Sequence, residues 1–219
     1  MGNIDLSNIN IANIQTISGM TVNEILAQMK ALGIGISGDN YTIRDYSDII
    51  TGDIVTGAEV TMGGYSWIVT SIQPSERVFY MISKDVISKC KHSNSTGMYP
   101  GSTLATTAKD FAATLPSNVQ DALIVRSSSG ISQKCHAPTF DQITTWFTEP
   151  SSRVAMYESA PCKYWLSDNG YFHSNNIYAL IVDTAGDCRK NTMGIAGNNA
   201  IGETIGSTQG FRAVVALMM

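Results

Sequence analysis

The chain has 219 residues, a length that suits one substantial domain with a small appendage. Fourteen Lys and Arg residues against 18 Asp and Glu give a net charge of −4, and no basic cluster is present, so a nucleic-acid partner is not expected. The longest apolar run, 213–219, is far too short for a membrane helix, so membrane insertion is not expected either.

The first fifty residues carry aliphatic side chains that we assign to anchoring and self-association. Their gaps alternate between two and three residues, which matches neither a helix nor a strand and favours an extended segment buried against another chain. The row consists of Ile4, Leu6, Ile9, Ile11, Ile14 and Ile17. A partly disordered leader is the alternative. The N-terminus also lacks the basic and apolar regions of a secretory signal.

A helix is predicted over 21–32. Thr21 and Glu24 have the spacing of a capping box, and Ile25 and Met29 belong to its apolar stripe. Because so short a stripe needs a partner, we expect symmetry-related copies to supply one. Residues 1–50 are therefore expected to form an extended and helical N-terminal anchor.

The remaining residues, 51–219, predict one α+β domain that is rich in strands, with short helices and long loops. A hairpin meander is expected first, with strands broken at Gly57 and Gly63-Gly64 and a return after a turn at 74–76. The later elements are predicted from their apolar patterns. Helices are expected at 103–115, 117–124 and 139–147, the last ended by Pro150, and strands at 164–166, 178–182 and 212–217.

The four cysteines, Cys90, Cys135, Cys162 and Cys188, are too thinly spread for a disulfide scaffold, and we expect free, mostly buried thiols. The pairs Cys90 with His92 and Cys135 with His136 leave a zinc site as an alternative, although their spacings are tighter than zinc loops normally have. No metal and no cofactor is predicted.

No catalytic residue is predicted, because the chain has neither a nucleophile elbow nor a phosphate-binding loop. Four late acids, Asp168, Asp183, Asp187 and Glu203, leave glycoside cleavage by a carboxylate pair as an alternative to solvated loop positions. Calcium at 183–187 is a further alternative to a plain turn.

The segment 165–176 combines aromatic rings with neutral amides and hydroxyls, the composition of adaptable recognition loops. The candidate ligand-binding residues are Asp168, Asn169, Tyr171, His173, Asn175, Asn176 and, in the next glycine-rich loop, Asn198 and Asn199. The alternative places Trp165 and Phe172 in the core and leaves the asparagines to serve turns. Trp165 itself is expected in the core.

Four segments stand in an order that resembles a known domain: VTMGGYSWIV at 60–69, YMIS at 80–83, WLS at 165–167 and GFRAVVAL at 210–217. They are similar to an uncharacterised domain of phage structural proteins and gut-bacterial surface proteins, related to the C-type-lectin-like and formylglycine-generating-enzyme-like folds. The resemblance covers about residues 53–217, with Ala213 where that family usually has proline.

The resemblance implies a C-type-lectin-like domain whose final strand follows a turn at Gly210 and pairs near the first strand. It also implies that Phe211 packs inward and that Arg212 pairs with an internal carboxylate or carbonyl. Cys162 and Cys188 are the only candidates for the reactive pair of the enzyme relatives, and nothing around them matches that motif. The enzyme activity is therefore not carried over.

These features predict a phage virion structural protein, such as a head or tail fibre or another surface appendage. We expect a homotrimer that contacts other virion proteins through its N-terminus and displays the lectin-like domain to a host-surface glycan or protein. A bacterial cell-surface adhesin and a polysaccharide-degrading enzyme are the alternatives.

Overall fold

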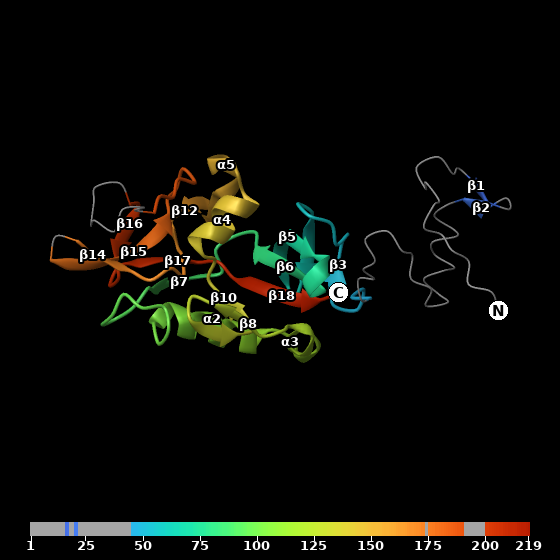
Figure 1. Ribbon diagram of the computed structural model, residues 1–219, viewed down its shortest axis with the longest axis horizontal. Helices are drawn as coiled ribbons and strands as arrows, with labels where there is room; N and C mark the ends of the chain where they lie inside the picture. The colour runs from blue at the N-terminus through green and yellow to red at the C-terminus, as the bar shows by residue number, and fades with distance from the viewer. Residues whose placement is uncertain (1–15, 18–19, 22–44, 174, 191–199) are drawn as a thin grey trace.

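The computed structural model describes residues 16–17, 20–21, 45–173, 175–190 and 200–219 (Figure 1). Before residue 45 it describes two short antiparallel strands, β1 (Thr16–Ile17) and β2 (Met20–Thr21). The predicted helix beyond Thr21 lies outside the described residues. So do seven of the eight oligomerisation candidates: Ile4, Leu6, Ile9, Ile11, Ile14, Ile25 and Met29.

The first large sheet has six antiparallel strands in the order β10-β18-β6-β5-β4-β3. Their bounds are β3 Ile50–Thr51, β4 Glu59–Met62, β5 Tyr65–Gln73, β6 Val78–Ser83, β10 Cys135–His136 and β18 Val214–Met218.

The predicted hairpin meander is confirmed in β4, β5 and β6. Gly63 and Gly64 have φ angles of 60° and 84°, the left-handed region that glycine adopts without steric cost, and they turn the chain between β4 and β5. The short helix η2 (Pro74–Glu76) makes the next turn. Buried side chains alternate along β4, whereas β6 is buried on both faces, with Phe79 in one core cluster and Ile82 in the other.

The second large sheet runs in the order β14-β15-β13-β17-β7, and β16 also pairs with β15. Its only parallel pair among the described strands is β13 with β17. The bounds are β7 Ser88–Lys91, β13 Tyr164–Trp165, β14 Tyr171–His173, β15 Asn176–Val182, β16 Gly202–Thr204 and β17 Thr208–Phe211. Two separate hairpins are β8 (Arg126–Ser128) with β9 (Ile131–Gln133), and β11 (Ala155–Tyr157) with β12 (Ala160–Cys162).

In the described part of the chain, helices α2 and α3 lie on one side of the sheets and α4 and α5 on the other (Figure 1). They are α2 Thr103–Thr114, α3 Ser117–Ala122, α4 Phe140–Trp146 and α5 Pro150–Arg153. The three predicted helices are confirmed, and α4 begins with a capping box between Thr139 and Gln142. Pro150, however, starts α5 rather than merely ending α4, because proline is tolerated at a first helical position.

The buried core starts before the predicted domain boundary at residue 51. Tyr46 and Ile50 are buried in the main cluster. The Tyr46 hydroxyl donates a hydrogen bond to the backbone carbonyl of Met218, with an Oη–O distance of 2.8 Å. The start and the end of the domain therefore meet at the side of the first sheet.

Two expectations for the C-terminal segment are wrong. Gly210 does not make a turn: it lies inside β17, where a Cβ atom would be 2.7 Å from Val86 Cγ2 and 2.9 Å from the Lys163 carbonyl oxygen. The strand predicted over 212–217 is found as β18 (Val214–Met218), and Arg212 and Ala213 before it carry the chain from the second sheet into the first. Strand β18 then pairs with β6 and β10, not with the strands that open the first sheet.

Arg212 is fully buried at this crossing, next to the inward-packed Phe211. Its Nε and Nη2 donate to the Ser83 carbonyl at 3.0 and 2.7 Å, and Nη2 also donates to the Lys84 carbonyl at 3.0 Å. Its Nη1 donates to the Arg153 carbonyl at 3.4 Å and to the Tyr164 hydroxyl at 3.1 Å. All five guanidinium N–H groups thus have acceptors, which lie on β6, α5 and β13 or on a residue adjacent to β6. The predicted pairing of Arg212 with internal carbonyls is confirmed.

The substitution Arg212→Lys should lower the free energy of unfolding by about 3 kcal/mol, because an ammonium has three donors and cannot reproduce the planar fork. Urea unfolding of the full chain measures this change. Arg189→Lys is the matched control, since Arg189 is exposed. Equal stability of the two variants would contradict the role of Arg212.

Candidate functional site

The candidate recognition residues divide into two groups, of which the first supports the fold. The Asp168 carboxylate accepts the Phe140 N–H at 2.6 Å and a hydrogen bond from Lys190 Nζ at 3.1 Å. Asp168 thus caps the start of α4. Asn169 Oδ1 accepts the Tyr99 N–H at 3.2 Å, which ties two loops together. Both residues hold the loop that leads into β14.

The second group lies on the hairpin of β14 and β15. Tyr171 stacks on Tyr178, its cross-strand partner, with ring centroids 5.8 Å apart. Asn175 sits in the turn with φ at 61°, a left-handed conformation that asparagine tolerates, and both Asn175 and Asn176 are exposed. His173 belongs to β14, while Asn198 and Asn199 lie outside the described residues.

Phe172 and Trp165 differ sharply in burial. Trp165 is completely buried, as predicted, and its Nε1–H donates to the Cys90 carbonyl at 2.9 Å. Phe172 is 62% exposed, so the alternative that placed it in the core is wrong. An aromatic ring that is exposed to this extent beside exposed amides is available for contact with another molecule.

The hairpin is supported by a loop that the sequence analysis did not single out, residues 93–102. The Gly170 N–H donates to the Gly97 carbonyl at 2.5 Å. A Cβ atom on Gly170 would lie 2.5 Å from the Tyr178 carbonyl oxygen and 3.0 Å from Gly97 Cα. Two glycines are therefore required where the loops cross. Glycines at 97 and 170 are a sequence signal for close approach of the backbone. A single sequence, however, does not reveal that these two positions contact each other.

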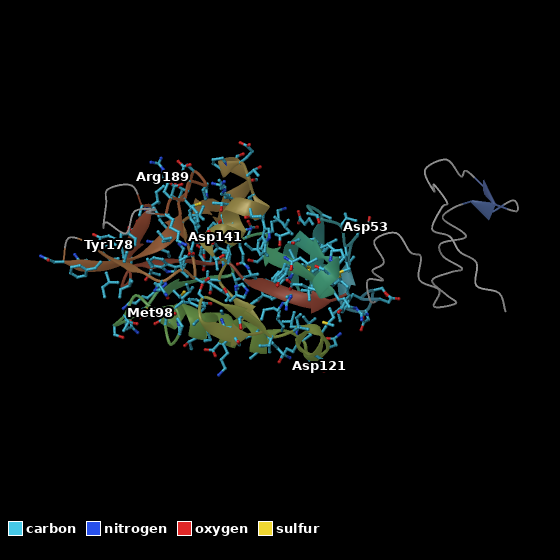
Figure 2. All side chains as sticks on the ribbon, in the orientation of Figure 1. Asp53, Met98, Asp121, Asp141, Tyr178 and Arg189 are labelled. Atoms are coloured by element: carbon cyan, nitrogen blue, oxygen red, sulfur yellow. The ribbon has the colours of Figure 1, made fainter. Side chains whose placement is uncertain are left out.

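Met98 follows this crossing and is 51% exposed. Met98 and Tyr178 lie toward the same end of the domain, away from Asp53 (Figure 2). The loop 93–102 and residues 169–173 and 175–178 together form one end of the domain, which we call the hairpin end.

Three of the four late acids, Asp168, Asp183 and Glu203, are engaged in local structure. Asp183 Oδ1 accepts the N–H groups of Ala185 and Asp187, both at 2.9 Å, so the predicted plain turn is confirmed. Glu203 pairs with Lys163 at 2.6 Å. Together with the capping role of Asp168, these contacts give each of the three carboxylates a partner within the fold.

The four cysteines are free, as predicted, with Cys135 and Cys188 buried and Cys90 and Cys162 half-buried. Burial raises the pKa of the Cys90 thiol to about 11 and also raises the pKa of Cys188, against the opposing effect of the nearby Arg153. Elevated pKa values disfavour the thiolates that nucleophilic chemistry requires.

The zinc alternative receives no support from the geometry. No group of three His, Cys, Asp or Glu side chains in the described part of the chain is arranged to hold a metal ion. The His92 ring lies edge-on to Trp165 at 5.5 Å, and neither ring nitrogen has a hydrogen-bond partner among the described residues. The His136 Nδ1–H donates to the Ala137 carbonyl at 2.8 Å.

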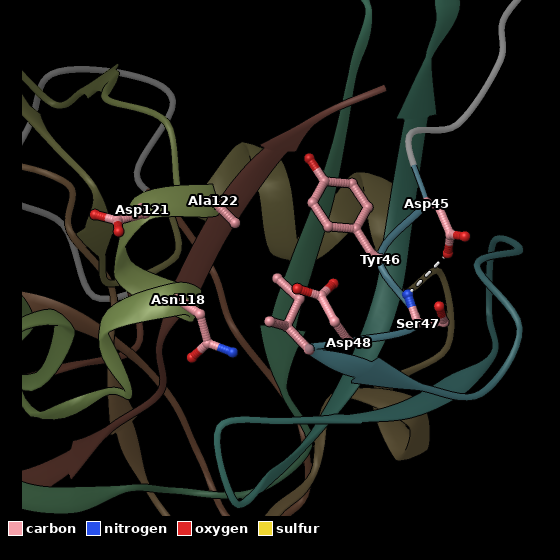
Figure 3. Close-up of a pocket in the computed structure, with 8 residues that line it drawn as sticks. Asp45, Tyr46, Ser47, Asp48, Asn118, Asp121 and Ala122 are labelled. Carbon is pink, nitrogen blue, oxygen red and sulfur yellow. Dashed lines mark hydrogen bonds between the residues drawn. The ribbon is translucent and has the colours of Figure 1, made fainter.

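A pocket of about 360 Å³ lies elsewhere, between 45–49 and helix α3 (Figure 3). Asp45, Asp48 and Asp121 line it, and Asp45 Oδ1 accepts the Ser47 N–H at 3.0 Å. The pocket lies where the domain begins, and it contains none of the predicted recognition residues.

Comparison with known proteins found no matching family model, no matching curated protein and no matching solved structure. Among the described residues, no helix is both long enough and apolar enough to cross a bilayer. The α+β character of the domain is therefore established by its own elements, whereas the lectin-like resemblance depends on the four sequence segments alone.

The buried histidines should make the domain sensitive to acid. Burial lowers the pKa values of His92 and His136 from 6.5 to about 4, so the unfolded chain takes up protons in a range where the folded chain does not. The free energy of unfolding should therefore fall as the pH falls from 6.5 toward 4, by about 2 kcal/mol per histidine between about pH 7 and about pH 5. Urea unfolding at the two pH values should show that His92→Leu removes about half of this dependence. If His92→Leu left the pH dependence of the free energy of unfolding unchanged, His92 would not be one of its sources.

The loop crossing gives a further prediction. Gly170→Ala should lower the free energy of unfolding by about 2 kcal/mol, because the added methyl group meets the Tyr178 carbonyl and the Gly97 backbone. Gly206→Ala is the control, since no atom lies within 4 Å of its added Cβ. Thermal unfolding compares the two variants. If Gly170→Ala were as stable as the control, the two loops would not be closely packed where they cross.

Proposed function

We propose that this chain is a structural protein of a phage virion, a head or tail fibre or another surface appendage. The residues that precede the buried Tyr46 form its anchor, through which it trimerises and contacts other virion proteins. The α+β domain is C-type-lectin-like and displays its hairpin end to a host-surface glycan or protein. The sequence resemblance, the aliphatic row and the low charge support this proposal.

The observation that carries the proposal is that the point where the chain enters the domain and the β14–β15 hairpin lie at opposite ends of it. Strand β3, where the chain enters from the N-terminal segment, lies beside the C-terminus, and the β14–β15 hairpin extends at the far end (Figure 1). The Tyr46–Met218 hydrogen bond fixes the first of these ends. A domain attached at one end and exposing an aromatic residue at the other has the layout of an attachment protein.

Binding is favoured over polysaccharide cleavage by the contacts of three of the four late acids. Asp168 caps a helix and pairs with Lys190, Asp183 closes a turn, and Glu203 pairs with Lys163. A general acid or base must be free to exchange a proton with its substrate. The contacts of these carboxylates suit structural support instead.

The anchor is tested by the mass of the protein in solution. Light scattering of the full chain should give a trimer, with three times the 23.6 kDa mass of one chain. Deletion of residues 1–35 should leave a soluble monomer, because it removes the aliphatic row while keeping Tyr46 and the rest of the buried core. A monomeric full chain, or a deletion variant that stays trimeric, would contradict the anchor assignment.

A further inference from the structure

The hairpin end carries two exposed apolar side chains on separate segments, Phe172 and Met98, together with the half-buried Ile177. Phe172 and Ile177 are cross-strand partners, so their side chains lie on one face of the hairpin. Ile177 also lies directly over Gly97, since a Cβ atom there would be 2.8 Å from Ile177 Cγ2. Met98 follows Gly97 in the chain. We call Phe172, Ile177 and Met98 the apolar tip.

The apolar tip is held in place before any partner arrives. The Gly170–Gly97 hydrogen bond and the Tyr99–Asn169 hydrogen bond join its two segments. Stacking of Tyr171 on Tyr178 stiffens the hairpin, and β16 pairs with the other side of β15. A surface that is already ordered loses little entropy on binding, so its apolar area contributes more fully to affinity.

The charge distribution indicates the chemistry of the partner. Residues 92–108 and 169–182 contain no Asp, Glu, Lys or Arg, although the chain carries 32 such residues in all. Among the charged residues near these segments, Asp168 is paired with Lys190 and Glu203 with Lys163. A charged group buried against this surface would lose its hydration without gaining a counter-charge. The matching partner surface is therefore uncharged.

We infer that the apolar tip is a protein-docking surface, which inserts Phe172 into an uncharged apolar pocket of a host-surface protein. Aromatic residues and methionine are enriched, and charged residues depleted, at the centres of protein–protein interfaces. Met98 and Ile177 add aliphatic area but no hydrogen-bonding groups, which suits a protein pocket better than a hydroxyl-rich glycan. This inference rests on the proposed attachment function and names its partner class.

The experiment measures labelling of a panel of intact bacterial cells by the fluorescently tagged full chain, titrated to half-maximal labelling. Phe172→Ser and Met98→Ser should each weaken labelling of the best strain, the former by roughly tenfold or more. Val55→Ser and Val125→Ser are matched controls, because these valines are 55% and 57% exposed outside the apolar tip. Thermal unfolding verifies that all four variants fold.

Treatment of the cells separates the partner classes. Proteinase K should abolish labelling, whereas periodate oxidation of glycans should leave it intact, and added salt should have little effect because no charge is involved. If Phe172→Ser left labelling unchanged, or if periodate but not proteinase K abolished it, the apolar tip would not be a protein-docking surface. Either result would leave the proposed attachment function in place. Failure to label any strain would count against both the attachment function and this inference.

Discussion

The buried guanidinium of Arg212 is the contact on which the arrangement of the two sheets depends. It lies where β17 of the second sheet becomes β18 of the first, and it donates to the ends of β6, α5 and β13. A buried charge is tolerated only when its hydrogen-bonding capacity is met, and here carbonyl and hydroxyl oxygens meet all of it. The fork therefore ties the crossing between the two sheets to the end of β6, to α5 and to β13.

The hairpin end depends on a different constraint, the close approach of two backbones. Gly97 and Gly170 meet without side chains between them, and Asn169 uses its amide oxygen to hold Tyr99. The exposed surface at this end therefore mixes the amides of Asn169, Asn175 and Asn176 with the apolar side chains of Phe172 and Met98.

The elements that could be predicted from the sequence are those with local signals. The paired glycines at 63 and 64 and the capping box at Thr139 each act within a few residues, so the meander and α4 were predictable. Strand β7 is too short to show a period, and although a strand is predicted at 164–166, nothing local indicates the partners of β13. Their pairing with β17 joins segments about 50 to 120 residues apart, which local patterns do not encode. For the same reason Asp168 and Asn169 resembled ligands, because their partners at 140 and 99 are remote in sequence.

The meeting of Tyr46 with Met218 means that the chain enters and leaves the domain at neighbouring points. Domains of this kind are modules: they tolerate insertion into other chains and circular permutation, since neither requires the interior to change. The same layout separates the residues of the hairpin from those that hold the two sheets together. Substitutions in the hairpin leave the contacts of Arg212 unchanged, so the same arrangement of sheets is able to present many different surfaces.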